Sequence, residues 1–309
     1  MGRYVARRLL QMIPVFIGST LLVFLMMYAL PGDPVRALAG EQAVDQAQIA
    51  QVKKDLGLDL PIWQQYWNYL AGLFQGDFGT QIATQRPVAD VIADAFPITV
   101  RLTLFAFAFT VIAGISMGVF AGLKADTFRD RGLLVLTLLL ISVPSFVLAF
   151  LAQYFFAHEL GWVEPVVSAA ADSQELILPA VVLGSLSLAY VARLTRTSVA
   201  ENLRSDYMRT AVAKGLPKRR IIGVHLMRNS MIPVVTFLGT DIGTLMGGAV
   251  VTEGIFNVQG VGYNVFQALK SREGSTVVGI VTLIVVVYLV SSLIVDLLYA
   301  VLDPRIRYA

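Results

Sequence analysis

Long apolar runs alternate with shorter polar stretches over the whole chain, and the apolar runs decide the predicted structure. An α-helix rises about 1.5 Å per residue, so about 20 apolar residues are needed to cross the hydrocarbon core of a bilayer. Runs of this length lie at about 9–30, 98–123, 133–157, 176–199, 231–252 and 276–302. The pattern predicts an all-α membrane protein with six transmembrane helices.

The composition agrees with a membrane protein and excludes several kinds of chemistry. Of the 309 residues, 56% are hydrophobic and 15% are charged, which is too little charge to cover a soluble domain. The absence of cysteine excludes thiolate metal sites and cysteine nucleophiles, and only two histidines are present. With so few of these ligands, we expect no metal and no cofactor on this chain. No G-x-x-x-x-G-K-[ST] loop occurs, so we also expect that the chain binds no ATP by itself.

The charges of the loops predict the orientation of the spans. Basic residues gather before the first span, after the second, at 193–230, where there are nine Lys or Arg, and at Arg305 and Arg307. Residues 31–96 hold four Lys or Arg against eight acids, and 158–175 hold no Lys or Arg. Because cytoplasmic loops carry the excess of basic residues, both termini are expected in the cytoplasm. Basic residues confined to these loops indicate topology and not nucleic-acid binding.

The same pattern divides the chain into three parts. Residues 1–30 form a basic head and an uncleaved first span, because the apolar run is longer than that of a signal peptide. Residues 31–96 form an extracytoplasmic segment, and residues 97–309 form the core with a basic cytoplasmic loop at 200–230.

A short amphipathic helix is predicted within the extracytoplasmic segment. One face of it carries Trp63, Tyr66, Trp67, Leu70 and Phe74. Trp and Tyr favour the headgroup region of a bilayer, so we expect this helix to lie on the outer leaflet. Contact with an external partner is compatible with that position.

Two of the predicted spans carry glycines four residues apart, which places each set on one helix face. The sets are Gly114, Gly118 and Gly122 in the second span, and Gly239, Gly243 and Gly247 in the fifth. Small residues at this spacing let two helix backbones approach closely. We expect both faces to serve helix packing, within the chain or against a partner subunit, with a role in gating as the alternative.

Two motifs resemble catalytic ones but lack the context that the chemistry needs. GISMG at 114–118 matches G-x-S-x-G, but it lies inside an apolar helix, and neither histidine is placed to activate Ser116. HELGW at 158–162 has Trp162 where H-E-x-x-H has its second histidine. Neither motif therefore supports a hydrolase.

Two acids fall within apolar spans, Asp241 in the fifth and Asp296 near the end of the sixth. A carboxylate inside the membrane is costly and by default suggests a transport pathway or a pairing role. We therefore take Asp241 as a candidate for the pathway, and a hydrogen-bonded structural role stays open beside it.

The stretch DYMRTAVAKGLPKRRIIGVHLMRNSMIP, 206–233, reads as two short helices separated at Gly215-Leu216-Pro217. The first helix has a compact apolar face made of Tyr207, Met208, Ala211 and Val212. A loop that only fixes orientation needs charge, but it needs no capped helix with such a face. The face predicts docking into a groove of another protein.

The segment YMRTAVAKGLPKRRIIGVHLMRNSMIPVVT resembles the cytoplasmic EAA-type loop of binding-protein-dependent ABC importer permeases, in the form typical of dipeptide, oligopeptide and nickel permeases. RRLLQMIPVFIGSTLLVFLMMYALPGDP, DLGLDLPIWQQYWNYLAGLFQGDFGT and GTDIGTLMGGAVVTEGIFNVQGVGYNVFQAL are similar to that family's first permease, in the same order. Where the general loop reads Glu-Ala-Ala, this chain has Arg209, Thr210 and Ala211. The peptide-type subset commonly lacks that glutamate.

The resemblance implies a fold, partners and a location. It implies the type I ABC importer permease fold of six helices in the cytoplasmic membrane of a bacterium or archaeon. The expected partners are a second homologous permease, two ATPase subunits or domains that bind ATP and Mg, an extracytoplasmic substrate-binding protein and the lipid bilayer. The chain would be a transport subunit and not an enzyme.

The resemblance also implies roles in coupling for residues of the helix at about 206–215. That helix would sit in a cleft of an ATPase subunit, and Gly215 would provide the tight turn. Its apolar contact would come from Tyr207, Met208, Ala211 and Val212, and the polar contacts nearby from Arg209, Lys214, Arg219 and Arg220.

The substrate and two competing functions stay open at this point. The family carries peptides and nickel, and because the outer loops hold His158 but no cysteine, di- and oligopeptides are favoured over nickel. An ATP-independent carrier or channel would need an ion site at the midplane, for which only Asp241 is a hint. An intramembrane hydrolase would rest on Ser116. The segment 254–274 is expected outside, folded toward the pathway mouth or in contact with the binding protein.

Overall fold

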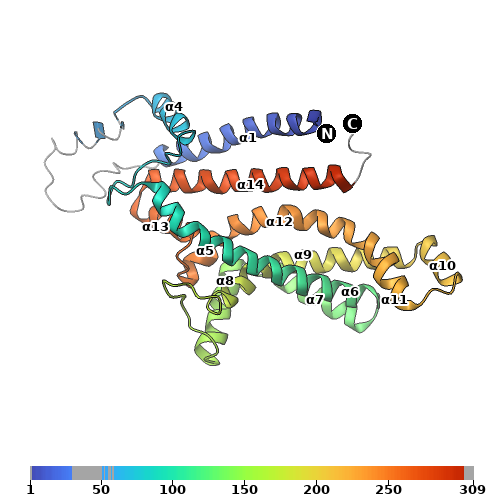
Figure 1. Cartoon of the computed structure of the whole chain (residues 1–309). Coiled ribbons are helices and arrows are strands. Elements are labelled where there is room, and N and C mark those ends of the chain that lie inside the picture. The colour runs from blue at the N-terminus through green and yellow to red at the C-terminus, as the bar shows by residue number, and fades with distance from the viewer. Residues whose placement is uncertain (1, 30–50, 52, 55–56, 58, 303–309) are drawn as a thin grey trace.

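The computed structural model describes residues 2–29, 51, 53–54, 57 and 59–302, and the long elements of this part are helices (Figure 1). Within these residues, five helices are long and apolar enough to cross a membrane, and a bent pair of helices makes a possible sixth. The beginning of the predicted extracytoplasmic segment, 31–50, and the basic residues Arg305 and Arg307 lie outside the described residues.

Five of the predicted spans correspond to continuous helices. The first is α1 (Gly2–Ala29), and the second is α5 (Val88–Phe109), η1 (Thr110–Gly114) and α6 (Ile115–Gly122) in one run. The fourth is α9 (Ile177–Leu203) and the sixth is α14 (Gly274–Leu302). The fifth joins α11 (Lys218–Arg220), η3 (Ile221–Leu226) and α12 (Met227–Phe256). The second and fifth runs therefore extend well beyond the predicted 98–123 and 231–252.

The third predicted span, 133–157, is not one helix, and the prediction of a continuous span is wrong there. α7 (Phe128–Ser142) is followed by α8 (Ser145–Ala152) and η2 (Gln153–Glu159), and the two parts are bent by 104°. Val143 is extended (φ −92°, ψ 125°), and Pro144 has no N–H to donate to the preceding turn. The chain therefore changes direction after Ser142.

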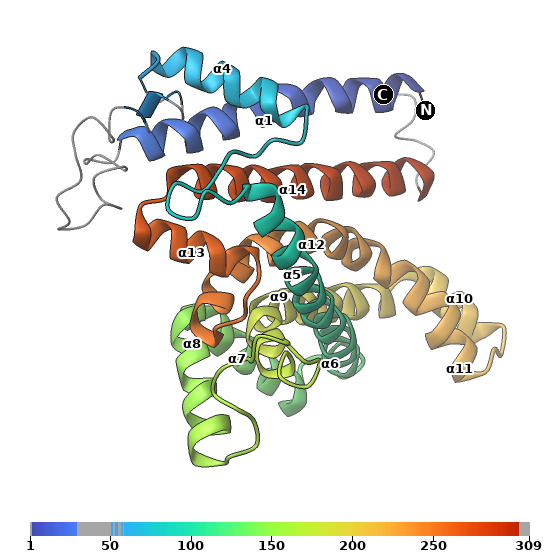
Figure 2. The same ribbon diagram turned by 60° about the vertical axis from the view of Figure 1, so that its left-hand side comes forward.

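The long helices run side by side and leave two distinct ends (Figures 1 and 2). α9 is central, because it packs against α5, α6, α7 and α12, while α1 packs against α14 and α14 against α12. α10 (Asp206–Ala213) and α11 lie at the end where α1 begins and α14 ends. α4 (Ile62–Leu73) and α13 (Val261–Ser271) lie at the opposite end.

The glycine face of the second span packs against α9. A Cβ atom at Gly118 would lie 2.5 Å from the carbonyl oxygen of Ala192, and one at Gly122 would lie 2.8 Å from the carbonyl oxygen of Arg196. A Cβ at Gly114 would lie 2.9 Å from a methyl group of Val191. Two of these contacts are with backbone atoms, so the backbones of α6 and α9 are as close as glycine permits.

The glycines of the fifth span do not all behave alike. A Cβ at Gly239 would lie 2.6 Å from Val295, and one at Gly243 would lie 2.8 Å from Tyr288, both on α14. Gly247 has no atom within 4 Å of the position of a Cβ, so it packs against no described helix. The expected packing role therefore fits Gly239 and Gly243, and Gly247 stands on an open face of α12.

Candidate functional site

The turn at Gly215 is where the sequence predicts it, between α10 and α11. Gly215 has a φ of +69°, the left-handed region that favours glycine. No atom lies within 4 Å of the position of a Cβ, so the backbone conformation and not the available space requires glycine here. Pro217 then precedes α11, which continues without a break into α12.

The inner face of α10 attaches the helix to its own chain. Met208 and Ala211 are 4% and 5% exposed and pack against Val199, Ile221 and Leu226. The Tyr207 hydroxyl belongs to the same side, where it lies 2.7 Å from Oδ1 of Asn202. An amphipathic helix buries its apolar face on the nearest apolar surface, and here that surface is the chain itself. In this arrangement Met208 and Ala211 are covered by their own chain, and their contact with an ATPase stays a prediction.

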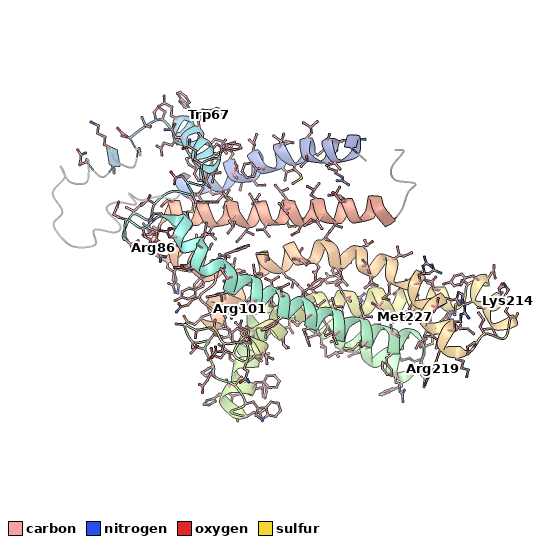
Figure 3. All side chains as sticks on the ribbon, in the orientation of Figure 1. Trp67, Arg86, Arg101, Lys214, Arg219 and Met227 are labelled. Carbon is pink, nitrogen blue, oxygen red and sulfur yellow. The ribbon has the colours of Figure 1, made fainter. Side chains whose placement is uncertain are left out.

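The outer face of α10 and the following turn form a basic surface around one apolar side chain. Val212 is 62% exposed and is the apolar member. Lys214 lies at the tip, and Arg219 lies on α11 (Figure 3). Arg209 and Arg220 are also exposed, and Arg209 makes only a long surface ion pair of 3.5 Å with Asp206. These five residues, Arg209, Val212, Lys214, Arg219 and Arg220, are called the basic tip below.

A buried ion pair fixes the base of this end of the bundle. The Asp130 side chain is 2% exposed, and the guanidinium of Arg196 on α9 binds both of its oxygens, with 2.7 Å between Nε and Oδ1. The backbone N–H of Asp126 also donates to Asp130, at 2.9 Å. The pair ties the α6–α7 turn to α9, and the sequence analysis did not identify it.

The two acids identified from the sequence lie in helix contacts. Asp241 is 3% exposed, and the Ser187 hydroxyl on α9 donates to its Oδ1 at 2.8 Å. No described group hydrogen-bonds its Oδ2. Asp296 forms a 3.0 Å ion pair with Arg8, between α14 and α1. Asp241 therefore faces the α9–α12 contact and not an open surface, which agrees with the structural role left open beside the pathway role.

A second buried carboxylate, Glu253, organises the opposite end, and the sequence analysis did not identify it either. Glu253 is fully buried and accepts hydrogen bonds from the Thr99 hydroxyl at 2.6 Å and from the N–H of Tyr263 at 3.0 Å. Thr99 in turn accepts the N–H of Val261 at 2.9 Å. A Cβ at Gly260 would lie 2.3 Å from oxygens of both side chains. This Glu253 cluster holds the start of α13 against α5.

Removal of the Glu253 carboxylate is expected to loosen this end of the protein. Glu253→Leu leaves the Thr99 hydroxyl and the Tyr263 N–H without an acceptor, which costs about 1–3 kcal/mol for each buried group. Glu253→Gln keeps one acceptor oxygen and is expected to lose less. The midpoint of thermal unfolding in detergent measures both variants. Glu175→Leu is the control, because Glu175 accepts equivalent bonds from Ser168 at the solvent-accessible surface. Equal stability of the Leu and Gln variants would contradict the role.

α4 attaches to the bundle through two tyrosines and turns its tryptophans outward. The Tyr66 hydroxyl donates to the carbonyl of Ile17 at 3.0 Å, and the Tyr69 hydroxyl donates to Thr282 at 2.8 Å. Trp63 and Trp67 are 68% and 69% exposed, and Trp67 points away from α1 in Figure 3. The predicted face is therefore divided, because Tyr66 packs inward while the tryptophans remain available to a membrane surface or a partner.

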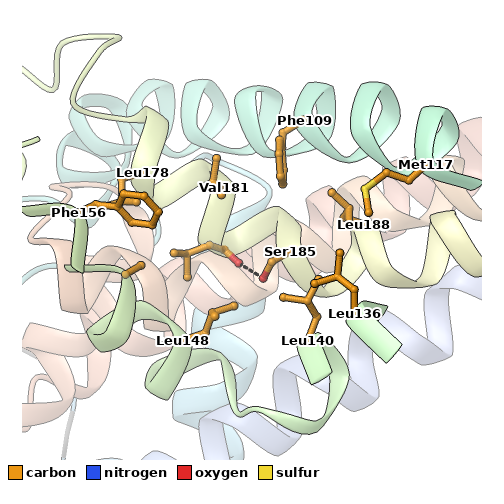
Figure 4. Close-up of a pocket in the computed structure, with 12 residues that line it drawn as sticks. Phe109, Met117, Leu136, Leu140, Leu148, Phe156, Leu178, Val181, Ser185 and Leu188 are labelled. Atoms are coloured by element: carbon orange, nitrogen blue, oxygen red, sulfur yellow. Dashed lines mark hydrogen bonds between the residues drawn. The ribbon is translucent and has the colours of Figure 1, made fainter. Parts of the chain in front are cut away.

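A cavity of about 270 Å³ lies between the second, third and fourth spans, beside the bend of the third (Figure 4). Its lining is apolar except for Ser185, whose hydroxyl donates to the carbonyl of Val182 at 2.7 Å. It offers no free polar group to a charged solute. We therefore do not assign the solute pathway to this cavity.

Comparison with known families covers nearly the whole chain. The family described as "Binding-protein-dependent transport system inner membrane component" matches residues 114–308, and the family of the N-terminal part of such membrane components matches residues 1–103. The chain belongs to this family of transport permeases. It is therefore a multi-pass permease of a binding-protein-dependent ABC importer in the cytoplasmic membrane, as the resemblance in its sequence implies.

Three named relatives match this permease over nearly its whole length. The dipeptide transport system permease protein DppB of Alkalihalophilus pseudofirmus is 37% identical over 331 aligned residues, which cover 99% of each chain. The glutathione transport system permease protein GsiC of Escherichia coli (strain K12) is 40% identical over 309 residues, which cover all of both chains. GsiC of Salmonella choleraesuis is also 40% identical over its whole length. These relatives are transport subunits and not enzymes.

Proposed function

We propose that this permease is one of two that form the pathway of an ATP-driven importer of di- and oligopeptides, with six spans and both termini in the cytoplasm. The observation that carries the proposal is the placement of α10 and the basic tip at the end where α1 begins and α14 ends (Figure 1). Putting that end in the cytoplasm puts the basic residues of 193–230 on the side where such residues accumulate. α4 and α13 then lie outside.

The basic tip is the proposed contact with the ATPase subunits, which bind ATP and Mg. Val212 enters an apolar groove of the partner, and the surrounding cations pair with acids at its edge. Met208 and Ala211 pass the movement of α10 to the core, because they share an apolar cluster with Val199 and Leu226. ATP-driven closure of two ATPases turns the pathway outward, toward the binding protein, and hydrolysis returns it inward.

The peptide substrate is supported by the relatives, which are named for dipeptide and glutathione transport. Nickel is the alternative solute, and competition of labelled dipeptide uptake by peptides and by nickel distinguishes the two. An ATP-independent carrier would need an ion site at the midplane, and the acid considered for that role, Asp241, is buried against Ser187.

A change at Gly215 tests the proposed coupling. Gly215→Leu forces a branched side chain into the left-handed region, at a cost of about 1–2 kcal/mol. We expect the variant to displace α10, to lower the amount of ATPase that copurifies in mild detergent and to reduce dipeptide uptake. Mass spectrometry of the copurified proteins measures the first effect, and uptake by vesicles measures the second.

Gly223→Leu is the matched control, because Gly223 lies on the same segment with no atom within 4 Å of a Cβ and without a positive φ. Recovery of a second permease and ATPases with the parent chain and with the control, but less ATPase with Gly215→Leu, supports the proposal. Recovery of the parent chain alone, active in liposomes without ATP, would favour a carrier instead.

A further inference from the structure

α9 is the most buried of the described spans, and its exposed residues form a narrow stripe. Between Leu178 and Thr197 its exposed residues are Leu186, Tyr190, Arg193 and Thr197. These positions follow one another at intervals of three or four, so they lie on one face of the helix. Three of the four are polar, although most of the helix is covered by apolar contacts.

The adjoining open face of α12 is also small and polar. Its exposed residues in the middle of the helix are Thr240, Thr244, Gly247, Gly248 and Val251. The rings of Tyr190 and Phe237 are 6.1 Å apart, which places this face next to the stripe on α9. Tyr190, Arg193, Thr240, Thr244 and Gly247 are called the polar stripe below.

The lipid-facing helices have a different surface. The exposed side chains of α1 and α14 include Leu10, Ile13, Leu22 and Ile294. Hydrocarbon chains solvate such residues, but an arginine in a span almost always faces the interior of a bundle or a water-filled cavity. Arg193 has no salt-bridge partner among the described residues. The open face of α9 and α12 therefore has the composition of a water-facing surface and not of a lipid-facing one.

Hydrogen bonds between the helices give the depth of Arg193. Ser187 pairs with Asp241, and Ser230 pairs with the carbonyl of Ser198 nearer the α10 end. Arg193 lies between these two levels on α9, closer to the α10 end than Thr240. Asp241, which follows Thr240 in the chain, is buried and has one oxygen without a described hydrogen-bond partner.

We propose that the polar stripe is this chain's wall of the peptide pathway, facing the second permease, and that Arg193 attracts the carboxylate of the peptide toward the cytoplasmic end. The inference rests on the proposed function, since it names the pathway residues for that substrate class. Hydroxyl groups, an amphipathic ring and unhindered glycine give weak, exchangeable contacts, which suit a solute that must leave again.

Single cysteines test the wall directly, because the chain has no cysteine of its own. Thr244→Cys and Gly247→Cys are treated in native membrane vesicles with a water-soluble methanethiosulfonate, and the label on this chain is measured by mass. Ile13→Cys on α1 is the lipid-facing control. We expect the stripe thiols to react at least about tenfold faster than the control thiol, since only a hydrated thiol ionises readily. A transported dipeptide is expected to slow the labelling of the stripe thiols. Labelling no faster than the control would overturn the wall.

The role of Arg193 is tested with Thr240→Cys and reagents of opposite charge. The measured quantity is the labelling rate with the anionic reagent divided by the rate with the cationic reagent. Because Arg193 is positive, Arg193→Gln is expected to lower this ratio about twofold to threefold. Arg193→Lys keeps the charge and is expected to preserve the ratio. An unchanged ratio in Arg193→Gln would overturn the electrostatic role.

Failure of the wall and failure of the proposed function give different results. A complex with a single stripe cysteine that takes up dipeptide with ATP but whose thiol is labelled no faster than the control refutes the wall alone. A chain that copurifies with no second permease and no ATPase refutes the importer, whatever the labelling.

Discussion

Gly118→Leu is expected to prevent α6 from packing on α9, so that little folded chain is recovered in detergent. The new side chain would meet the carbonyl of Ala192 and the side chain of Thr195, each 2.5 Å from the position of its Cβ. A backbone carbonyl cannot move away as a flexible side chain can, so the helices must separate along the whole glycine face. Overpacking typically costs about 1–3 kcal/mol and sometimes more, and a backbone clash between two spans belongs at or above the upper end.

The yield of monodisperse chain and its unfolding midpoint measure this effect. Gly132→Leu on α7 is the matched control, because Gly132 is also a helical glycine and no atom lies within 4 Å of a Cβ there. The control is expected to keep or raise stability, since leucine favours a helix more than glycine does. If both variants unfolded at the same temperature as the parent, the close α6–α9 contact would be refuted.

Breaking the Asp130–Arg196 pair is expected to give the second large loss. Asp130→Leu leaves the guanidinium of Arg196 without its partner, and removal of one partner of a buried pair costs about 3–5 kcal/mol. The side chain of Arg196 is 21% exposed, so the loss is expected toward the lower end of that range. The α6–α7 turn should also loosen, because Asp130 accepts the N–H of Asp126.

The double variant Asp130→Leu/Arg196→Met separates charge burial from packing. It removes both charges and is expected to recover most of the lost stability, as replacement of a buried pair by apolar groups often does. Asp94→Leu is the control for a surface pair, because Asp94 and its partner Arg86 are largely exposed, and its effect should stay within about 1 kcal/mol. A double variant as unstable as Asp130→Leu alone would show that packing, not the charge, is responsible.

The spans were predictable from sequence because their signal is the length of an apolar run, which does not depend on contacts. The bend at Val143–Pro144 was not, since Pro14, Pro97 and Pro233 all lie inside continuous helices. Proline removes one donor in each case, and only the surrounding packing decides whether the helix continues.

Site features that depend on neighbouring residues could be predicted, whereas contacts between distant segments could not. The Gly215 turn is confirmed. It could be predicted because a residue in the left-handed region is commonly glycine, which is visible in the sequence itself. The apolar face of α10 was visible too, but its periodicity could not tell whether Met208 would be covered by another protein or by Val199 of the same chain. Asp130 and Glu253 were missed because each lies near the end of an apolar run, where an acidic residue is normally assigned to a solvent-exposed loop.

The unbroken run from Lys218 to Phe256 has a mechanical consequence. At about 1.5 Å per residue, its 39 residues make a rod of about 58 Å that starts beside the basic tip and ends in the Glu253 cluster. A rod that pivots at its base multiplies small rotations, so a tilt of about one degree displaces the far end by about 1 Å. Movements too small to disturb the packing around α10 can therefore shift α13 at the opposite surface by about 1 Å, which is enough to break a hydrogen bond.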